Sequence, residues 1–383
     1  MKKGVLVAAL IAAGLMAALG SGCRRGKGQD SRQEGKPKVK IALAFPMTGD
    51  NAEYGQSFLV AAQIMVDKWN QAGGVLGRQI ELVVYDDKNS AEKAASIAQQ
   101  IVSSKDIVGV LGHFSSGVSM TAAPLYQANQ VIEISNTASH PDYSKIGNYI
   151  FRNNTVISAE FNVIVDVIAN DLKLNKVGII AIKTDWGTAA GAIAADLIQA
   201  NNKLTLVAYE QVLETSNDHG PAIAKLKAAG AEAVVAVGMY SLYGPLARQY
   251  KEVDPKIQLM GVSNAYTQQI IQLGGTAVEG LIAPVSFFAE SEYPEVQKFV
   301  DEFKSRLGIE PSALAAQAYD SIGILLQAIK EAGALDREKV RDAVNAINYP
   351  GITGPTFFNS LGDADKQFQK VVIRNGKFVQ YKR

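Results

Sequence analysis

The chain has 383 residues, of which 48% are apolar and 20% charged, so it can bury one large hydrophobic core or two ordinary ones. Its 38 basic and 37 acidic residues give a net charge of +1, and no long basic face is evident, which argues against nucleic acid as a partner. We therefore expect a globular protein of two domains that binds no nucleic acid.

The first 22 residues have the pattern of an export signal. Two lysines precede an apolar stretch from Val5 to Leu19, and the small residues GSG follow. The apolar stretch is shorter than the roughly 20 residues that a transmembrane helix needs. We predict a signal peptide over residues 1–22 and no membrane span in the mature chain.

Cys23 is the only cysteine in the sequence, so no intramolecular disulfide can form. The segment around it resembles a bacterial lipobox, although Gly20 stands where that family usually has leucine. The resemblance implies cleavage before Cys23 and acylation of its thiol; the alternative is ordinary cleavage that leaves a stray thiol or none. Residues 23–37 continue as a polar, charged and glycine-containing segment, which predicts a flexible tether. We expect an exported protein, in the periplasm or at the outer face of the cytoplasmic membrane, anchored through Cys23.

Short β-branched apolar runs alternate with longer helical patterns from Val39 onward. Strands that are apolar on both faces and alternate with helices predict a parallel sheet covered on both sides. The expected strands of a first sheet are 39–45, 80–86, 107–112 and 131–135, with helices around 53–71, 91–104 and 118–129.

The same alternation then predicts a second sheet. Its strands are 177–182, 204–210, 232–238 and 257–261, with helices around 187–201, 219–229 and 243–252. Helical patterns at 294–307, 313–332 and 336–347 have too few strands between them for a third domain, so we expect them to cover a lobe already built. The fold class is α/β with two doubly wound lobes, whose carboxyl-end loops face a shared crevice.

The turn GHFSSG (112–117) follows one expected strand and leads into a helix near Gly117, which places Ser116 at the helix N-cap. The free N–H groups of the first helical turn and the hydroxyls of Ser115 and Ser116 suit a carboxylate. The alternative is that Ser116 only caps its own helix.

A second polar loop, SNTASHP (135–141), follows the next strand and is expected beside the first loop. A carbonyl acceptor at Thr137 and a hydroxyl at Ser139 would complete a pocket for an α-ammonium group and a carboxylate. The same composition is also that of an ordinary turn.

Catalytic and metal-binding patterns are weak in this sequence. His113 and Ser115 lie two residues apart at a strand end, where side chains diverge, so we interpret His113 as structural. The turn lacks the G-x-S-x-G elbow, and no HExxH, CxxC or P-loop occurs. Asp86 and Asp87 more often cap a following helix than bind a metal. We expect no enzyme, no metal and no cofactor.

Four segments occur in one order and spacing: TGDNAEYGQSFLVAAQ (48–63), WNQAGGVLGRQIELVVYDDKNS (69–90), the GHFSSG turn and SNTASHPDY (135–143). Together they resemble the Leu/Ile/Val-binding proteins, type I periplasmic binding proteins that feed ABC importers, from about Lys38 to the end of the chain. The resemblance implies a membrane permease as partner and two lobes joined by a three-strand hinge. With crossings expected near 182–183, 284–286 and 353–355, the lobes are 38–182 plus 286–353 and 183–285 plus 354–383.

The resemblance also assigns ligand-binding residues on the amino-terminal lobe. Ser116 matches a serine that binds the ligand's α-carboxylate, Ser139 stands where the family has threonine, and Tyr54 matches an aromatic residue that walls the pocket. The expected residues of this lobe are Tyr54, Ser115, Ser116, Thr137, Ala138 and Ser139.

On the other lobe, the resemblance places Tyr240, or Met239 by a shift of one residue, against the ligand, and Trp186 replaces the commoner tyrosine. Ser263 stands where amino-acid binders carry a glutamate for the ammonium group. Asp185 is the nearest candidate for the missing acid, although it could instead cap the helix that follows.

The sequence therefore predicts an extracytoplasmic solute-binding protein that closes on a small amino acid, first of all a branched-chain or hydrophobic one. Two alternatives stay open. Because Ser263 replaces an acid, the ligand could be an amide, a urea-like compound or an aromatic carboxylate. The protein could also be a sensor that presents its closed state to a regulatory partner.

Overall fold

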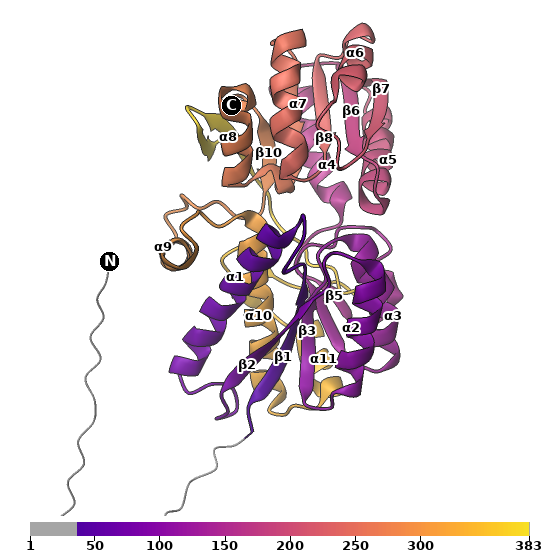
Figure 1. The fold of residues 1–383 in the computed structure, drawn as a ribbon. Helices are drawn as coiled ribbons and strands as arrows, with labels where there is room; N and C mark the ends of the chain where they lie inside the picture. The colour runs from indigo at the N-terminus through magenta and orange to yellow at the C-terminus, as the bar shows by residue number, and fades with distance from the viewer. Residues whose placement is uncertain (1–36, 383) are drawn as a thin grey trace, which may run out of the picture. The chain divides into compact units, whose positions relative to one another are not determined.

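The computed structural model describes residues 37–382, so the expected signal peptide, Cys23 and nearly all of the tether lie outside the described residues. The chain from Lys36 onward forms one compact unit. It is built on two sheets, each covered by helices (Figure 1). None of the helices in the described range is both long and apolar enough to cross a bilayer.

The amino-terminal sheet has five parallel strands in the order β2-β1-β3-β4-β5. Its strands are β1 Val39–Phe45, β2 Ile80–Asp86, β3 Ile107–Gly112, β4 Ile132–Ser135 and β5 Ile150–Arg152. Helices α1 Ala52–Gln71, α2 Ala91–Ser103 and α3 Ser116–Ala128 connect the strands.

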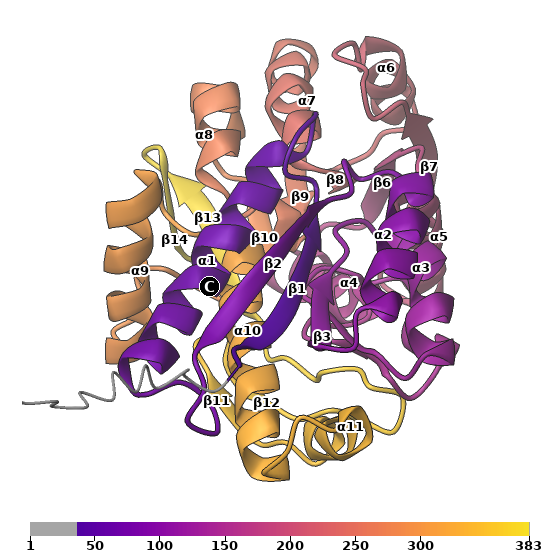
Figure 2. The ribbon, with the colours of Figure 1, turned by 60° about the horizontal axis from the view of Figure 1, so that its bottom comes forward.

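Both faces of this sheet are buried, as the apolar strands predict. In β1, Leu43 and Phe45 belong to the core beneath α1, whereas Ala42 and Ala44 belong to the core beneath α2 and α3. Figure 2 shows α1 on one side of β1 and β2, and α2 and α3 on the other. Because successive side chains of a strand point to opposite faces, one apolar run fills both layers.

The carboxyl-terminal sheet has seven strands in the order β14-β13-β10-β9-β8-β6-β7. β13 runs antiparallel to both of its neighbours, β10 and β14. Its strands are β6 Lys176–Ile182, β7 Thr205–Val212, β8 Ala233–Val237, β9 Gln258–Gly261, β10 Ile282–Val285, β13 Gln369–Arg374 and β14 Lys377–Gln380. The accompanying helices are α4 Ile157–Asp166, α5 Asp185–Ala200, α6 Gly220–Ala228, α7 Tyr240–Val253 and α8 Gln268–Gly274.

Three further helices return to the amino-terminal sheet, as the sequence predicts. Helices α9 Pro294–Leu307 and α10 Ala313–Ala332 pack against α1, and α11 Arg337–Asn345 packs against α10. A short hairpin of β11 Tyr349–Gly351 and β12 Gly354–Thr356 follows. The prediction of two doubly wound lobes is thereby confirmed.

The chain passes between the sheets three times, but two of the expected crossings are wrong. β6 already pairs with β7 and β8, so the first crossing lies between β5 and α4 rather than at 182–183. The second crossing follows Val285, as expected. The third lies later than 353–355, because Asp363 still bonds Arg152 beside β5 and β13 begins only at Gln369.

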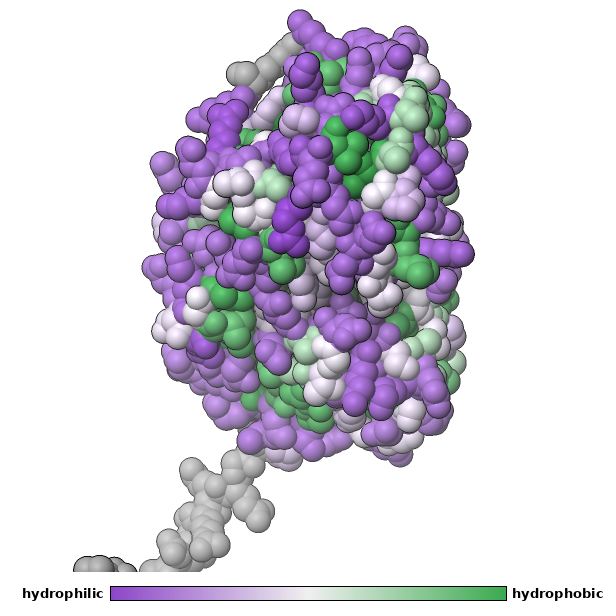
Figure 3. All heavy atoms as spheres, turned by 45° about the horizontal axis from the view of Figure 1, so that its top comes forward, coloured by the Kyte–Doolittle hydropathy of each residue, from purple (hydrophilic) through white to green (hydrophobic). Residues whose placement is uncertain are grey.

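The surface carries no broad apolar area on the face drawn in Figure 3, where hydrophobic residues form small separate groups among hydrophilic ones. The large apolar side chains that are most exposed in the described residues are Leu213 at 63% and Phe357 at 51%, and they belong to different lobes. Scattered exposure of this kind is normal for a soluble surface and marks no interface by itself.

Candidate ligand-binding site

The loops that follow β3 and β4 meet at the carboxyl edge of the amino-terminal sheet. Ser116 Oγ accepts hydrogen bonds from the N–H groups of Ser139 at 3.2 Å and His140 at 3.3 Å. Helix α3 begins at Ser116 itself, with Ser115 as its N-cap, one residue earlier than expected. The alternative that Ser116 only caps its own helix is therefore wrong, because its hydroxyl holds the neighbouring loop instead.

The side chains next to these serines shape the two loops. Ser115 Oγ donates to Asn89 Oδ1 at 2.7 Å, and Thr137 Oγ1 donates to the Phe114 carbonyl at 2.6 Å. Ala138 is fully buried, and its N–H donates to Ser135 Oγ at 3.0 Å. Ala138 therefore supports the loop from behind.

His113 is a structural residue, in agreement with the sequence analysis. Its Nδ1 lies 2.6 Å from Asp87 Oδ2 and its Nε2 lies 3.2 Å from the Tyr126 hydroxyl, with His113 and Asp87 fully buried. Asp87 was expected to cap the next helix; instead, Ser90 caps α2 and Asp87 orients His113. No cluster of potential metal ligands occurs in residues 37–382.

Residues from the two sheets meet directly across these loops. Trp186, in the first turn of α5, donates its indole N–H to Ser139 Oγ at 2.7 Å. The Tyr240 N–H points at the Tyr54 hydroxyl at 3.4 Å, and Tyr54 stacks on Phe114 with ring centroids 4.6 Å apart. Burial raises the pKa of the Tyr54 phenol, so this hydroxyl stays neutral.

A cavity of about 20 Å³ lies between the facing loops. A single water needs roughly 10–15 Å³, so an amino acid fits only if the contact between Trp186 and Ser139 opens. The cavity is lined by Phe114, Ser115, Ser116, Thr137, Ser139, Trp186, Met239, Asn264 and Leu314.

The structure leaves five of the ten expected residues outside this cavity, namely Tyr54, Ala138, Asp185, Tyr240 and Ser263. Met239 lines the cavity in place of Tyr240, so the alignment shifted by one residue agrees with the lining. Asp185 is exposed. Its carboxylate lies close to Gly117 on α3, because a Cβ added at Gly117 would be 2.9 Å from Asp185 Oδ2. Ser263 is buried, but it bonds to a residue outside the predicted set.

That residue is Glu160 on α4. Its carboxylate accepts from the Ser263 N–H at 2.7 Å and from Ser263 Oγ at 2.8 Å, and the side chain is buried. Burial raises the pKa of Glu160 to about 7, although both bonds from Ser263 oppose the rise. Tyr243 is a further titratable group near this carboxylate.

Glu160 could have been found from its position in an apolar stripe. Ile157, Phe161 and Ile164 are buried on the same helix at the spacing of one face, and Glu160 falls between them. An acid on a buried stripe is unusual unless it has a partner. The apolar stripe predicts that Glu160 is buried, but it does not predict that Ser263 is its partner.

Comparison with known proteins gives consistent results. A family model described as periplasmic binding protein matches residues 38–380. The leucine-, isoleucine-, valine-, threonine- and alanine-binding protein of Pseudomonas aeruginosa is 28% identical over 326 residues, which cover 85% of this chain and 87% of that protein. A Leu/Ile/Val-binding protein homolog of Brucella suis is 29% identical over 328 residues, with the same coverage.

The fold also matches solved structures. The branched-chain amino acid transporter substrate binding protein LivJ from Streptococcus pneumoniae, in complex with isoleucine, superposes with a TM-score of 0.82 at 25% identity. The match covers 89% of this chain and 98% of that one.

Proposed function

The chain belongs to the periplasmic binding protein family, and we propose that it is the solute-binding protein of an ABC importer. Its ligand in this proposal is a hydrophobic amino acid, in the first place a branched-chain one. One observation carries the proposal. Ser139 from one sheet and Trp186 from the other, both expected in the site, touch across a shared cavity. A ligand that replaces this contact would connect the two lobes and favour closure.

The polarity of the two sides suggests how an amino acid would lie. The carboxylate would take the hydroxyls of Ser116 and Ser139, which accept hydrogen bonds in this structure and keep their own protons free to donate, together with the Ser116 N–H at the start of α3. The ammonium group would face Ser263, whose hydroxyl is backed by Glu160. In this proposal Glu160, rather than Asp185, supplies the acid that the sequence lacks at position 263.

Isothermal titration calorimetry with leucine, isoleucine and valine tests the proposal, with lysine as the control solute. We expect binding of at least one branched-chain amino acid. Glu160→Gln should weaken that binding about tenfold or more, because a charge-assisted partner is worth about 1.5–3 kcal/mol. Absence of binding with all three, beside clear binding of an amide, would reject the amino acid as ligand.

A neutral amide or urea-like ligand is the second candidate, and the raised pKa of Glu160, at about 7, favours it. A protonated Glu160 leaves Ser263 without a charged neighbour, and Asn264 adds an amide to the lining. The affinity of an amino acid should rise as the pH increases through 7, because Glu160 ionises. The affinity of an amide should not rise over the same range.

We further propose that the protein is held at the outer face of the cytoplasmic membrane through Cys23 and delivers its ligand to a permease. The single cysteine directly after a small-residue segment supports this. Mass spectrometry of the mature amino terminus should find a diacylated cysteine. A terminus that begins beyond Cys23 would contradict the anchor, while ligand binding would be unaffected.

A further inference from the structure

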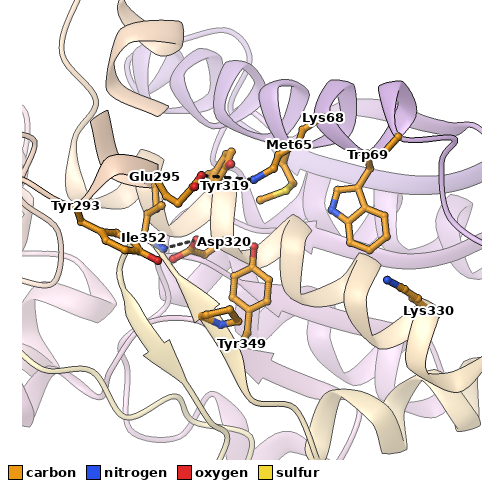
Figure 4. Close-up of a pocket in the computed structure, with 12 residues that line it drawn as sticks. Met65, Lys68, Trp69, Tyr293, Glu295, Tyr319, Asp320, Lys330, Tyr349 and Ile352 are labelled. Carbon is orange, nitrogen blue, oxygen red and sulfur yellow. Dashed lines mark hydrogen bonds and ion pairs between the residues drawn. The ribbon is translucent and has the colours of Figure 1, made fainter. Parts of the chain in front are cut away.

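A second cavity, of about 450 Å³, lies away from the cleft, between helices α1 and α10 of the amino-terminal lobe. It is lined by residues of α1, α10, the start of α9 and β11 (Figure 4), and it is partly open to solvent. None of its lining residues also lines the cavity between Ser139 and Trp186. Its size falls within the range of small-molecule sites, roughly 300–1,000 Å³.

Apolar and aromatic side chains form the walls of this second cavity. Met65 and Tyr319 are buried at 2% and 6% exposure, and Trp69 lies beside them at the end of α1. Tyr349 fits against α10 only because position 323 is glycine, where a Cβ would collide with the tyrosine hydroxyl. The walls are therefore preformed by packing.

The carboxylates near this cavity are already bonded. Asp320, which lines the cavity, is fully buried and accepts from the Ile352 N–H at 3.0 Å and the Thr353 hydroxyl at 2.6 Å. Glu295 lies 3.9 Å from Lys68 Nζ and 3.1 Å from Lys298 Nζ.

Lys330 is exposed, and it takes part in none of the ion pairs found among the described residues. Its Nζ lies 5.9 Å from the centre of the Trp69 ring. The Trp69 indole N–H has no hydrogen-bond partner in residues 37–382, and Figure 4 shows Trp69, Lys330 and Tyr349 around the same space. The cavity thus combines an aromatic wall with one uncompensated positive charge and a free donor.

We propose that this cavity is a second ligand site and that it binds a small aromatic monocarboxylate. The ring would lie between Trp69 and Tyr349, and the carboxylate would bind Lys330 and the Trp69 indole N–H. The tether is a poor occupant, because residues 24–36 contain five basic and two acidic side chains, the same net sign as Lys330.

The floor of the cavity is connected to the third crossing. Thr353 bonds Asp320 on one side, and its hydroxyl accepts from Lys366 Nζ at 3.0 Å on the other. Lys366 is buried three residues before β13 enters the carboxyl-terminal sheet. An occupant of the cavity would therefore lie against the segment that joins the lobes.

The chain has two tryptophans, one in each cavity, which makes the test selective. In Trp186→Phe, the only indole left is Trp69, so its fluorescence reports the second cavity alone. We expect benzoate to change this fluorescence saturably at micromolar to millimolar concentration. Benzylamine, of the same shape and opposite charge, should not do so.

Lys330→Gln in the same background should weaken benzoate binding about tenfold, because a charge-assisted hydrogen bond is replaced by a neutral one. Lys339, on α11, is also an exposed lysine, and Lys339→Gln is the matched control that should leave binding unchanged. No fluorescence change with benzoate, or equal effects of the two lysine variants, would overturn the proposal. Binding of amino acids in the cleft is measured separately, from the fluorescence of Trp186 in Trp69→Phe, so a failure of the proposed function is distinguished from a failure of the second site.

Discussion

The two sides of the cleft differ in how the residues that line it are held in place. On the amino-terminal side, the expected serines and Thr137 line the cavity within two loops that are bonded to each other. On the carboxyl-terminal side, only Trp186 does so as expected; Asp185 faces solvent and Ser263 turns to Glu160.

The difference follows from how each side is built. The amino-terminal loops leave adjacent parallel strands and are held from below by the buried His113 and Asp87. The carboxyl-terminal side also depends on α4, which arrives from the first crossing and whose first N–H, at Ile157, donates to the Ser139 carbonyl at 3.1 Å. Contacts between distant segments decide that side, so local patterns describe it less well.

The largest expected effect tests the contact that joins both sides. Trp186→Ala removes a buried indole that would contact the ligand from the carboxyl-terminal lobe, and we expect a loss of ligand affinity of about 2–4 kcal/mol, as for other buried aromatic anchors. Trp69→Phe is the control and should keep the affinity. Calorimetric titration measures both. Unchanged affinity in Trp186→Ala would remove this contact from the site.

Glu160→Gln tests the buried acid through stability. The folded protein holds the Glu160 proton up to about pH 7, whereas the unfolded chain releases it near the ordinary pKa of 4.5. The contribution of Glu160 to stability is therefore greatest below pH 4.5 and falls by about 3 kcal/mol as the pH rises to 7, at 1.36 kcal/mol per pH unit.

Glu160→Gln should abolish that part of the fall, because a glutamine does not ionise. Urea unfolding at a series of pH values measures it, with the exposed Glu81→Gln as control. An identical pH dependence in Glu160→Gln and the parent would show that the carboxyl ionises freely in the fold.

Ser116→Ala tests the amino-terminal side alone. It leaves the N–H groups of Ser139 and His140 without their acceptor, so we expect affinity to fall by about 1–3 kcal/mol. Ser119, one turn along α3, bonds the carbonyls of His113 and Ser115. Ser119→Ala should lower the melting temperature and leave affinity nearly unchanged. Similar affinity losses in both variants would indicate that the substitutions act by destabilising α3, and that Ser116 has no specific part in binding.

The smallest effect is expected from Asp185→Asn. An exposed carboxylate near the start of α3 contributes about 0.3–1 kcal/mol, so affinity should change less than about fivefold. A loss of tenfold or more for a branched-chain amino acid would restore Asp185 as the partner of the ammonium group and displace Glu160 from that role.

The sequence by itself determined the α/β class, most strands and helices, and the loops of the amino-terminal side. Apolar runs with periods of 2 and 3.6 report burial directly, and polar loops after parallel strands must gather at one edge of the sheet. Short elements such as β5 and β10, and helix α4, gave no comparable signal.

Only the tertiary structure decided where the chain crosses between sheets and which acid is the partner of Ser263. β6 and β13 join the carboxyl-terminal sheet through pairing with strands distant in sequence. Glu160 meets Ser263 across 103 residues. Trp69, Lys330 and Tyr349 likewise come together only because α1, α10 and β11 pack side by side. Such partners are set by long-range packing, which no local pattern encodes.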